Sequence, residues 1–558
     1  MRRSLFRRPE VVLLLALNVL VLVGIGVVLW GRMHPVELEV IEPPEARAVD
    51  WEQRYASDAG DGVDCAGCNV LMVSLDIFRP DHMPCFGYGK PTAPHICDMV
   101  EHGVTFDNFI VHAYQTPVSQ MSLFTGRYPS SSGFVSFASK LSADVPYFPE
   151  SMKAGGYNTV ALGSSFEVMT DMSNADSGRR SFTRQGLNPG LSFGRGFDRF
   201  VFTGNRNLPT DGITWLQQHG HEKFFLWMIL GTLHWPYGAQ GDPAQRTMFD
   251  PPNYQGVLAK ESSLGFELLS HIYKGRLYEP EDPTRSVPLE ASDAAYINSR
   301  YDFGLWTVDA FIGELMAAIP PEVMQNTLIV LHGVHGEDLG EHGYFGHYDV
   351  YDTEVRSTLI VLNPKHRASG VRVKEQVQGV DLTPTLLDVL GLPALPNTDG
   401  HSFREVWSTG KGDPENTSYF QRIPLWEDIF RHKGGMPQLF VSKVADLLDA
   451  RVVGDTGLRT LRWKLLHRTA RAVEAEVSWW TYVSNLPVRR SEWELYDLLA
   501  DPTEQHNVVA DRADVAEGLK QRLLAWEQAL PEAKRETVLP LPVPSGAPEA
   551  SGAPEAAP

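Results

Sequence analysis

The segment that decides the fold is Asn326–Gly343, NTLIVLHGVHGEDLGEHG. Its first part, NTLIVL, is a short apolar run of the kind that forms a buried strand. The second part places histidines and carboxylates directly behind the strand, an arrangement that suggests a metal site at the strand end. Val334 occupies the turn, where a carboxylate would do most for a metal. The segment therefore predicts a strand that leads into a functional site, or into the shell of a site that no longer works.

Further apolar runs recur along the chain and alternate with amphipathic helices. They are short and closed by turn or charged residues: NVLMVSL from Asn69, NTVALG from Asn158, KFFLWMIL from Lys223 and STLIVL from Ser357. Helical stretches such as 301–319 lie between them. This alternation predicts an α/β fold, with a doubly wound, mostly parallel sheet and helices on both faces.

The alternation indicates where the domains begin and end. We expect the α/β domain at 65–404 and a smaller C-terminal α+β subdomain at 405–530, where charged turns separate short strand-like runs and a helix follows from about Arg512. Residues 531–558 contain SGAPEA twice together with many prolines, so they are expected to be disordered.

The N-terminus predicts a membrane anchor. Residues 1–10 contain four arginines, and 11–30, VVLLLALNVLVLVGIGVVLW, contain one polar side chain, Asn18. These 20 residues, at about 1.5 Å each, span a hydrocarbon core of about 30 Å. The arginines predict a cytoplasmic N-terminus, with a stalk at 31–64 and the main domain outside the membrane, periplasmic or extracellular. A cleaved signal peptide is the alternative, but the long apolar run favours an uncleaved signal-anchor.

The net charge and the cysteine content indicate which binding partners and which cellular compartment to expect. The formal net charge of −20 argues against a nucleic-acid partner, whose phosphates would be repelled. The four cysteines, Cys65, Cys68, Cys85 and Cys97, lie in one short region. Outside the cytoplasm this predicts one or two local disulfides, with the pairing left open and a four-cysteine zinc site as the alternative.

A hydroxyl near the start of a helix is a candidate for anion chemistry. In HAYQTPVSQMSLFTGRYP, Thr116 precedes Pro117, and proline is favoured at the first helical position. Thr116 is therefore expected to cap a helix. A hydroxyl there lies beside the positive helix end and is suited to receive a sulfate or phosphate. A plain structural cap is the alternative.

Motifs along most of the chain establish a family resemblance. They are DIFRPDHMPCFGYGKPTAPHICDMVEHGVTFDNF at Asp76, VSQMSLFTGRYP at Val118, GFDRF at Gly196, HWPY at His234, HGEDLGEHG at His335, VDLTPTLLDVLG at Val380, DGHSF at Asp399 and ELYDLLADPTEQHN at Glu494. From about Asn69 to Asn507, the chain resembles the sulfatase family of the alkaline phosphatase superfamily. This resemblance implies a doubly wound α/β fold with a small C-terminal subdomain, and cleavage of sulfate or phosphate esters with a divalent metal.

Several site positions depart from the family pattern. The first strand of sulfatases ends in two calcium-binding aspartates, which match Asp76 and Ile77. The cysteine that becomes formylglycine matches Thr116, which excludes standard sulfatase chemistry by that route. A threonine nucleophile does occur in related phosphodiesterases and phosphoryl transferases. A family arginine matches Gln120, so one fixed positive charge is missing.

The later motifs show the same mixture of retained and lost groups. A Gly-Lys-x-His motif matches 163–166, GSSF, and lacks both its lysine and its histidine. His234 matches a histidine that orients the sulfate and the leaving group, and Lys464 matches a late lysine that contacts the anion. The metal-binding pair before Gly-Glu matches Val334 and His335.

A metal is expected only if the site is active. Calcium takes six to eight oxygen ligands, whereas the matching positions offer Asp76 and Thr116. Zinc would accept His335 together with Asp76, and His332 as a further nitrogen ligand. An apolar Val334 raises the cost of holding a dication there. The cofactor is therefore calcium or zinc in an active protein, and none in an inactive one.

Three functions remain open. The first is a metal-dependent phosphodiesterase or phosphoryl transferase with Thr116 as nucleophile and His234 as acid or orienting group. The second is a pseudoenzyme, a membrane-anchored module that binds a glycan, a lipid headgroup or a protein. The third is a structural component of the cell envelope. The missing aspartates and basic residues favour the second.

Overall fold

A computed structural model describes residues 49–135, 139–165, 168, 192–261, 263–279, 285–413, 415–422, 455–468 and 491–530. The expected transmembrane helix at 11–30, most of the stalk and the C-terminal tail lie outside these residues. Among the residues that are described, no helix is long and apolar enough to cross a membrane. The membrane anchor therefore stays a prediction.

An eight-stranded sheet forms the centre of the α/β domain, in the order β13-β2-β12-β9-β1-β5-β3-β4. Its strands are β1 Asn69–Leu75, β2 Val104–Ile110, β3 Asn158–Gly163, β4 Arg199–Phe202, β5 Phe224–Leu230, β9 Thr327–Gly333, β12 Arg356–Leu362 and β13 Val371–Gln378. Neighbouring strands are parallel except on both sides of β12, which is antiparallel to β2 and to β9. The predicted mostly parallel sheet is confirmed.

The central strand shows why these sequences are apolar throughout. Val70 and Met72 of β1 belong to one hydrophobic core, whereas Leu71 and Val73 belong to another. Successive side chains of a strand point to opposite faces of the sheet. Because a core covers each face, all residues of β1 are buried, and a continuous apolar run is required.

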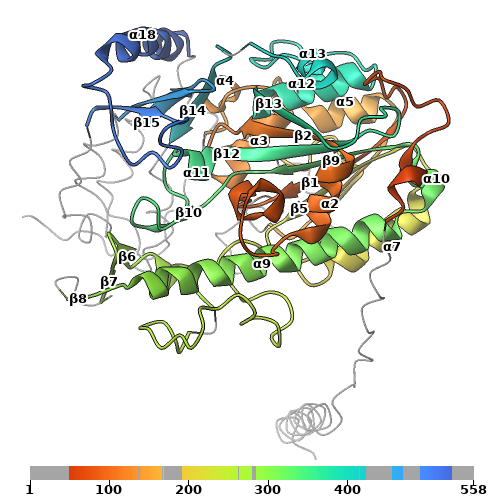
Figure 1. Ribbon diagram of the computed structural model, residues 1–558. Helices are drawn as coiled ribbons and strands as arrows, with labels where there is room; N and C mark the ends of the chain where they lie inside the picture. Colours follow the sequence, from red (N-terminus) through yellow and green to blue (C-terminus); the bar gives the residue numbers. More distant parts are fainter. Residues whose placement is uncertain are drawn as a thin grey trace, which may run out of the picture. The chain divides into compact units, whose positions relative to one another are not determined.

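Helices form the outer layers on both faces of the sheet (Figure 1). One layer contains α2 Pro94–His102, α7 Leu208–His219 and the long α9 Ala291–Ala318. The opposite layer contains α3 Thr116–Thr125, α5 Phe148–Ala154, α12 Gly379–Val389 and α13 Arg404–Thr409. The short elements are η2 Trp51–Arg54, η3 Pro80–His82, η4 Pro84–Phe86, α4 Pro129–Ser132, α8 Phe266–Leu269, α10 Pro321–Met324, α11 Asp352–Val355, β6 Ile272–Tyr273, β7 Arg276–Tyr278, β8 Ser286–Pro288, β10 Asp338–Leu339 and β11 Phe345–Gly346.

The C-terminal subdomain is a separate antiparallel sheet with one helix. Its strands are β14 Ser418–Arg422, β15 Asp455–Arg459, β16 Trp463–His467 and β17 Trp493–Asp497, in that order across the sheet. The helix α18 (Ala513–Ala529) packs Leu519 and Leu523 against Leu458, Leu465 and Leu495 of the strands. This small core accounts for the expected helix near Arg512.

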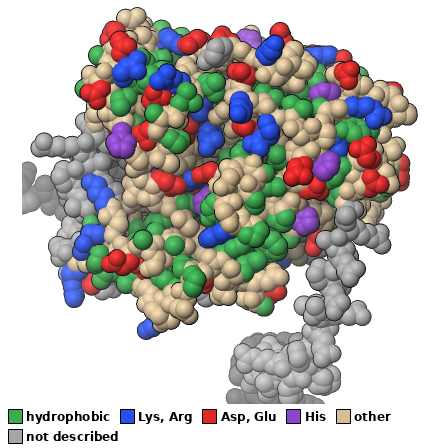
Figure 2. All heavy atoms as spheres, in the orientation of Figure 1, with side chains coloured by type: hydrophobic (Ala, Val, Ile, Leu, Met, Phe, Trp, Pro, Cys, Tyr) green, Lys and Arg blue, Asp and Glu red, His purple; other side chains and the backbone are tan. Residues whose placement is uncertain are grey.

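The four cysteines form two disulfides, Cys65–Cys68 and Cys85–Cys97. The prediction of local disulfides is confirmed, and the structure supplies the pairing that the spacing left open. On the face of the molecule shown in Figure 2, acidic and basic side chains are interspersed with hydrophobic ones, so neither sign of charge forms a continuous surface there.

Candidate active site

The candidate site lies where β1 and β9 end. The two strands run in parallel with Leu75 opposite Gly333, so the residues that follow them emerge at the same edge of the sheet. Two backbone hydrogen bonds join the strand ends: Val334 N donates to Leu75 O at 2.8 Å, and Phe78 N donates to His335 O at 2.7 Å. The sheet thereby brings the two turns together.

Helix α3 adds a hydroxyl to this edge. The helix begins at Thr116 with Gln115 in the capping position, one residue earlier than the sequence predicts. The Thr116 hydroxyl donates to Asp76 Oδ1 at 3.1 Å and lies 3.0 Å from His335 Nε2. Its partners therefore come from the ends of β1 and β9, and Thr116 is fully buried between them.

Asp76 and His335 form a buried ion pair. His335 Nε2 lies 3.1 Å from Asp76 Oδ1, and His335 Nδ1 lies 2.8 Å from the carbonyl oxygen of Gly336. A carbonyl oxygen can only accept, so Nδ1 carries a proton. A neutral ring would then face the carboxylate with an unprotonated Nε2, whereas an imidazolium donates to it. The geometry therefore fits a charged ring.

The pKa shifts of both partners agree with this assignment. Burial by itself raises the pKa of Asp76, but the hydrogen bond and charge of His335 outweigh burial and bring it to about 2. Burial lowers the pKa of His335, but the hydrogen bond to Asp76 outweighs this, and the pKa rises above its usual value. Each group thus favours the charged form of the other.

Two further histidines and a glutamate surround the pair. The ring of His347 lies 4.6 Å from that of His335 and 5.1 Å from that of His234. His347 Nδ1 is 2.8 Å from Glu337 Oε2, and burial raises the pKa of Glu337 to about 7. The sequence places Glu337 among the carboxylates that follow the strand and assigns no role to His347. The signal for His347 was its position shortly after the histidine-rich turn.

His234 contributes a buried ring nitrogen to this site. It follows β5, and its Nδ1 lies 3.2 Å from the carbonyl oxygen of Trp235. His234 Nε2 is buried, and among the described residues it has no hydrogen-bond partner. Burial lowers the pKa of His234, although the charge of Asp76 opposes that shift. A largely neutral imidazole therefore stands beside the ion pair.

His332, a candidate metal ligand in the sequence, lies inside the sheet. Its Nε2 is 2.8 Å from Ser74 Oγ on the neighbouring strand β1, and its Nδ1 is 3.1 Å from the carbonyl oxygen of Gly333. Burial lowers its pKa to about 4. Both nitrogens are thus used within the sheet, and the structure does not bring His332 together with Asp76 and His335.

Lys464 also lies in a different environment from the predicted one. Its side chain is fully buried, with Nζ 3.0 Å from Asp352 Oδ1 and 3.1 Å from Glu504 Oε1. The sequence predicts a contact between this lysine and a bound anion. In the structure the ammonium instead pairs with two carboxylates where the C-terminal sheet meets the α/β domain, and the anion contact stays a prediction.

Gln120, which stands where the family has an arginine, lies in a tightly packed, buried environment. His112, Ser119, His332 and Val334 line the same place. Both polar atoms of the Gln120 amide are buried and, within the described parts of the chain, have no hydrogen-bond partner. The position thus holds a neutral and unsatisfied group.

The residues of this site do not fit a divalent metal. In the described part of the chain, no group of three or more His, Cys, Asp or Glu side chains is arranged to hold a metal ion. Asp76 Oδ1 already accepts from the Ile77 amide at 3.1 Å, from Thr116 and from His335. The side chains of Ile77 and Val334 carry no ligand atom, and a metal-bound histidine must be deprotonated at the bound nitrogen.

Ile77 has an unusual backbone conformation for its residue type. Its φ is 44°, in the left-handed region. A β-branched residue in this region is an outlier, whereas asparagine and aspartate adopt it far more readily. Two hydrogen bonds hold the backbone on both sides of the Ile77 Cα, from Ile77 N to Asp76 Oδ1 and from Tyr301 Oη to the carbonyl oxygen of Ile77.

The chain is similar in sequence and in fold to known proteins. The family model described as Sulfatase matches residues 68–392. N-acetylglucosamine-6-O-sulfatase of Bacteroides thetaiotaomicron is 23% identical over 541 residues, which cover 84% of this chain and 88% of that protein. Arylsulfatase K of Mus musculus is 22% identical over 475 residues, 82% of this chain and 78% of that protein. Among solved structures, phosphonate monoester hydrolase of Agrobacterium radiobacter matches with a TM-score of 0.59 and 18% identity, over 84% of this chain and 97% of that one.

Proposed function

The chain belongs to the sulfatase family, and we propose that it is a member that has lost metal-dependent ester hydrolysis and acts as a binding module outside the membrane. By homology it is a sulfatase-family hydrolase, and members of this family typically bind a divalent metal. The location of the protein outside the membrane rests on the predicted N-terminal anchor.

The observation that carries the proposal is the ion pair between Asp76 and His335. To bind a metal, His335 would have to lose a proton that a buried carboxylate stabilises, and Asp76 would have to give up hydrogen bonds. Breaking a buried ion pair is strongly unfavourable because one charge is left uncompensated. With Ile77 and Val334 offering no donors, a metal gains little in return.

A glycan is the ligand class that we propose. The bacterial relative is named N-acetylglucosamine-6-O-sulfatase, which denotes a sugar substrate for that protein. In this chain, the half-buried ring of Trp235 lies 4.2 Å from the ring of His234 between centroids. His234 Nε2 is a buried acceptor without a hydrogen-bond partner among the described residues. An amphipathic ring beside a polar group suits a ligand with one apolar face and hydroxyl groups. A lipid headgroup and a protein are the other candidate ligands.

One distance favours a second function. Thr116 Oγ1 and His335 Nε2 are 3.0 Å apart, the spacing of a nucleophile and its general base. This supports a phosphodiesterase or phosphoryl transferase with Thr116 as nucleophile. Two features oppose it: Thr116 is fully buried, and an imidazolium cannot accept the hydroxyl proton.

Metal content and turnover test the two functions together. The purified chain is assayed for bound calcium, manganese and zinc, and for hydrolysis of aryl sulfates and phosphodiesters. We expect less than stoichiometric metal and no turnover. Stoichiometric metal that is lost in Asp76→Ala would overturn the proposal. Turnover that is lost in Thr116→Ala, but kept in the control Thr125→Ala on the same helix, would establish the second function.

A further inference from the structure

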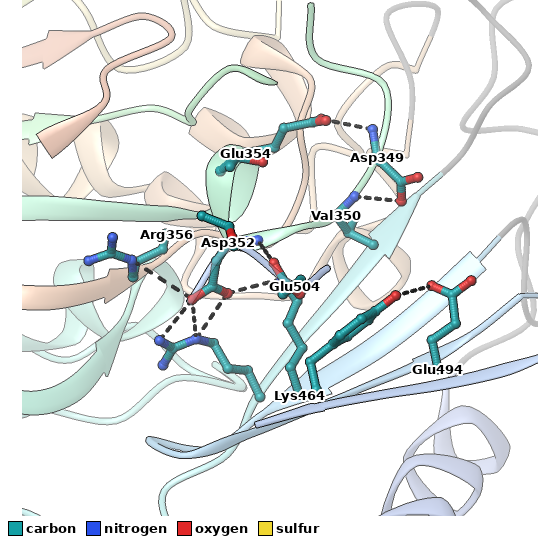
Figure 3. A network of polar contacts seen from close by, with 12 residues as sticks. Asp349, Val350, Asp352, Glu354, Arg356, Lys464, Glu494 and Glu504 are labelled. Atoms are coloured by element: carbon teal, nitrogen blue, oxygen red, sulfur yellow. Dashed lines mark hydrogen bonds and ion pairs between the residues drawn. The ribbon is translucent and has the colours of Figure 1, made fainter. Parts of the chain in front are cut away.

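A buried network of charges joins the C-terminal subdomain to the α/β domain (Figure 3). Asp352 lies at its centre, at the start of α11, with its side chain 5% exposed. Its carboxylate lies 3.0 Å from Arg459 on β15 and 3.0 Å from Lys464 on β16. Arg356, from its own domain, is farther away at 3.8 Å. The closest cations of Asp352 therefore come from the subdomain.

A second acid of the same segment is neutralised in the same way. The Asp349 carboxylate pairs with Arg468, which follows β16. Arg468 also lies 2.7 Å from Glu494 and 3.3 Å from Asp455, both in the C-terminal sheet. Its side chain is 1% exposed. The segment that contains Asp349 and Asp352 thus depends on three cations of the subdomain for its charge balance.

The same segment holds the peptide that follows His335. Gly336 N donates to the carbonyl oxygen of Glu354 at 2.7 Å, and Glu337 N donates to that of Thr353 at 2.9 Å. At the other end of α11, the Asp352 amide donates to the Glu504 carboxylate. Helix α11 therefore contacts the subdomain through Asp352 and the candidate site through its carbonyl groups.

We propose that Lys464 is a positioning residue, which acts through Asp352 and α11 to hold His335 against Asp76. These contacts are independent of whether the site binds or cleaves an ester. Removal of the Lys464 ammonium leaves Asp352 paired with Arg459 and Arg356. The segment that contains Asp349 and Asp352 therefore loses part of its neutralising charge, but Asp352 keeps cationic partners. The expected result is local loosening of α11 and of the peptide at Gly336.

Hydrogen exchange in the full chain measures that loosening. Lys464→Met is compared with Arg462→Met, which removes a cation of the turn between β15 and β16 whose side chain is 53% exposed and whose partner is Asp497. In Lys464→Met, the amides of Gly336 and Glu337 should exchange about tenfold faster, as expected for a change in local opening. Those of β1 and β5 should not change, and Arg462→Met should resemble the unaltered protein.

A spectroscopic signature separates positioning from general destabilisation. The ¹⁵N shifts of the His335 ring report its protonation and its contact with Asp76, and they should change in Lys464→Met and not in Arg462→Met. Faster exchange in every strand, or in 455–468 alone, would overturn the proposal, as would unchanged exchange at Gly336. If Lys464→Met does not fold, Glu504→Gln removes one of its two carboxylates while keeping an acceptor for the Asp352 amide. A smaller rise at Gly336 supports the proposal, and no rise there refutes it.

Discussion

Replacement of Asp76 by asparagine tests whether this carboxylate belongs to an ion pair or to a metal site. Asp76→Asn keeps the shape of the side chain and removes its charge. The pKa of Asp76 is about 2 in the folded protein, against about 3.9 in an unfolded chain. At about 1.4 kcal/mol for each pKa unit, the carboxylate contributes about 2.6 kcal/mol to the free energy of unfolding at pH 7. We expect Asp76→Asn to lower it by that amount.

The pH dependence follows from the direction of the shift. Because folding lowers the pKa of Asp76, its contribution is fully present above the unfolded pKa and is lost as the pH falls through about 2. The difference between Asp76→Asn and the unaltered protein should therefore be large at pH 7 and shrink at pH 3. Urea unfolding at both pH values measures it. Asp497→Asn, which removes a surface partner of Arg462, is the control, with an expected change below about 1 kcal/mol.

The opposite sign would refute the ion-pair assignment. In a metal site without its metal, carboxylates repel one another, and removal of one of them stabilises the folded state. An increase in the free energy of unfolding of Asp76→Asn, measured in the presence of a chelator, would show that Asp76 belongs to such a site. It would also remove the main support for a non-hydrolytic protein.

Three further predictions concern other parts of the α/β domain. Gln120→Met should raise the urea midpoint, with a gain of about 1–2 kcal/mol, because it replaces a buried amide that has no partner in the described structure. Burial raises the pKa of Asp309 to about 7, so its folded form binds a proton more tightly than the unfolded chain. The free energy of unfolding should therefore fall as the pH rises from about 4 to about 7. In Asp309→Asn, the free energy of unfolding should depend less on pH over this range. The double substitution Cys85→Ser/Cys97→Ser removes a disulfide between residues that are 12 positions apart. It should lower the free energy of unfolding by about 3 kcal/mol, measured by thermal unfolding.

The sequence predicted the features that depend on local pattern. Runs such as NVLMVSL are apolar because two cores cover the sheet, and this requirement can be read from consecutive residues. Asp76 and His335 lie together because β1 and β9 are parallel and end at the same edge of the sheet. The antiparallel insertion of β12 between β2 and β9 was not predictable, because its apolar run has the same pattern as its parallel neighbours.

Contacts between distant residues account for the remaining differences. Lys464 pairs with Asp352 across 112 positions of the chain, and no local pattern indicates that a lysine in a strand will face an acid of another domain. The family resemblance predicted a contact between Lys464 and a bound anion, because a lysine with that role in the family matches this position. His347 was missed for a related reason: its importance comes from the position of its ring beside His335, which the fold alone determines.

The charge of the site explains why its substitutions belong together. Three carboxylates at this edge would need a dication, since buried like charges cannot all stay ionised. With Ile77 and Val334 in place, Asp76 is the remaining acid at these positions, and the single charge of His335 balances it. Ile77 keeps a left-handed backbone that suits asparagine or aspartate, at a cost of about 1–2 kcal/mol. The turn thus has a backbone conformation suited to a polar side chain although it carries an apolar one, which supports the proposed loss of metal-dependent hydrolysis.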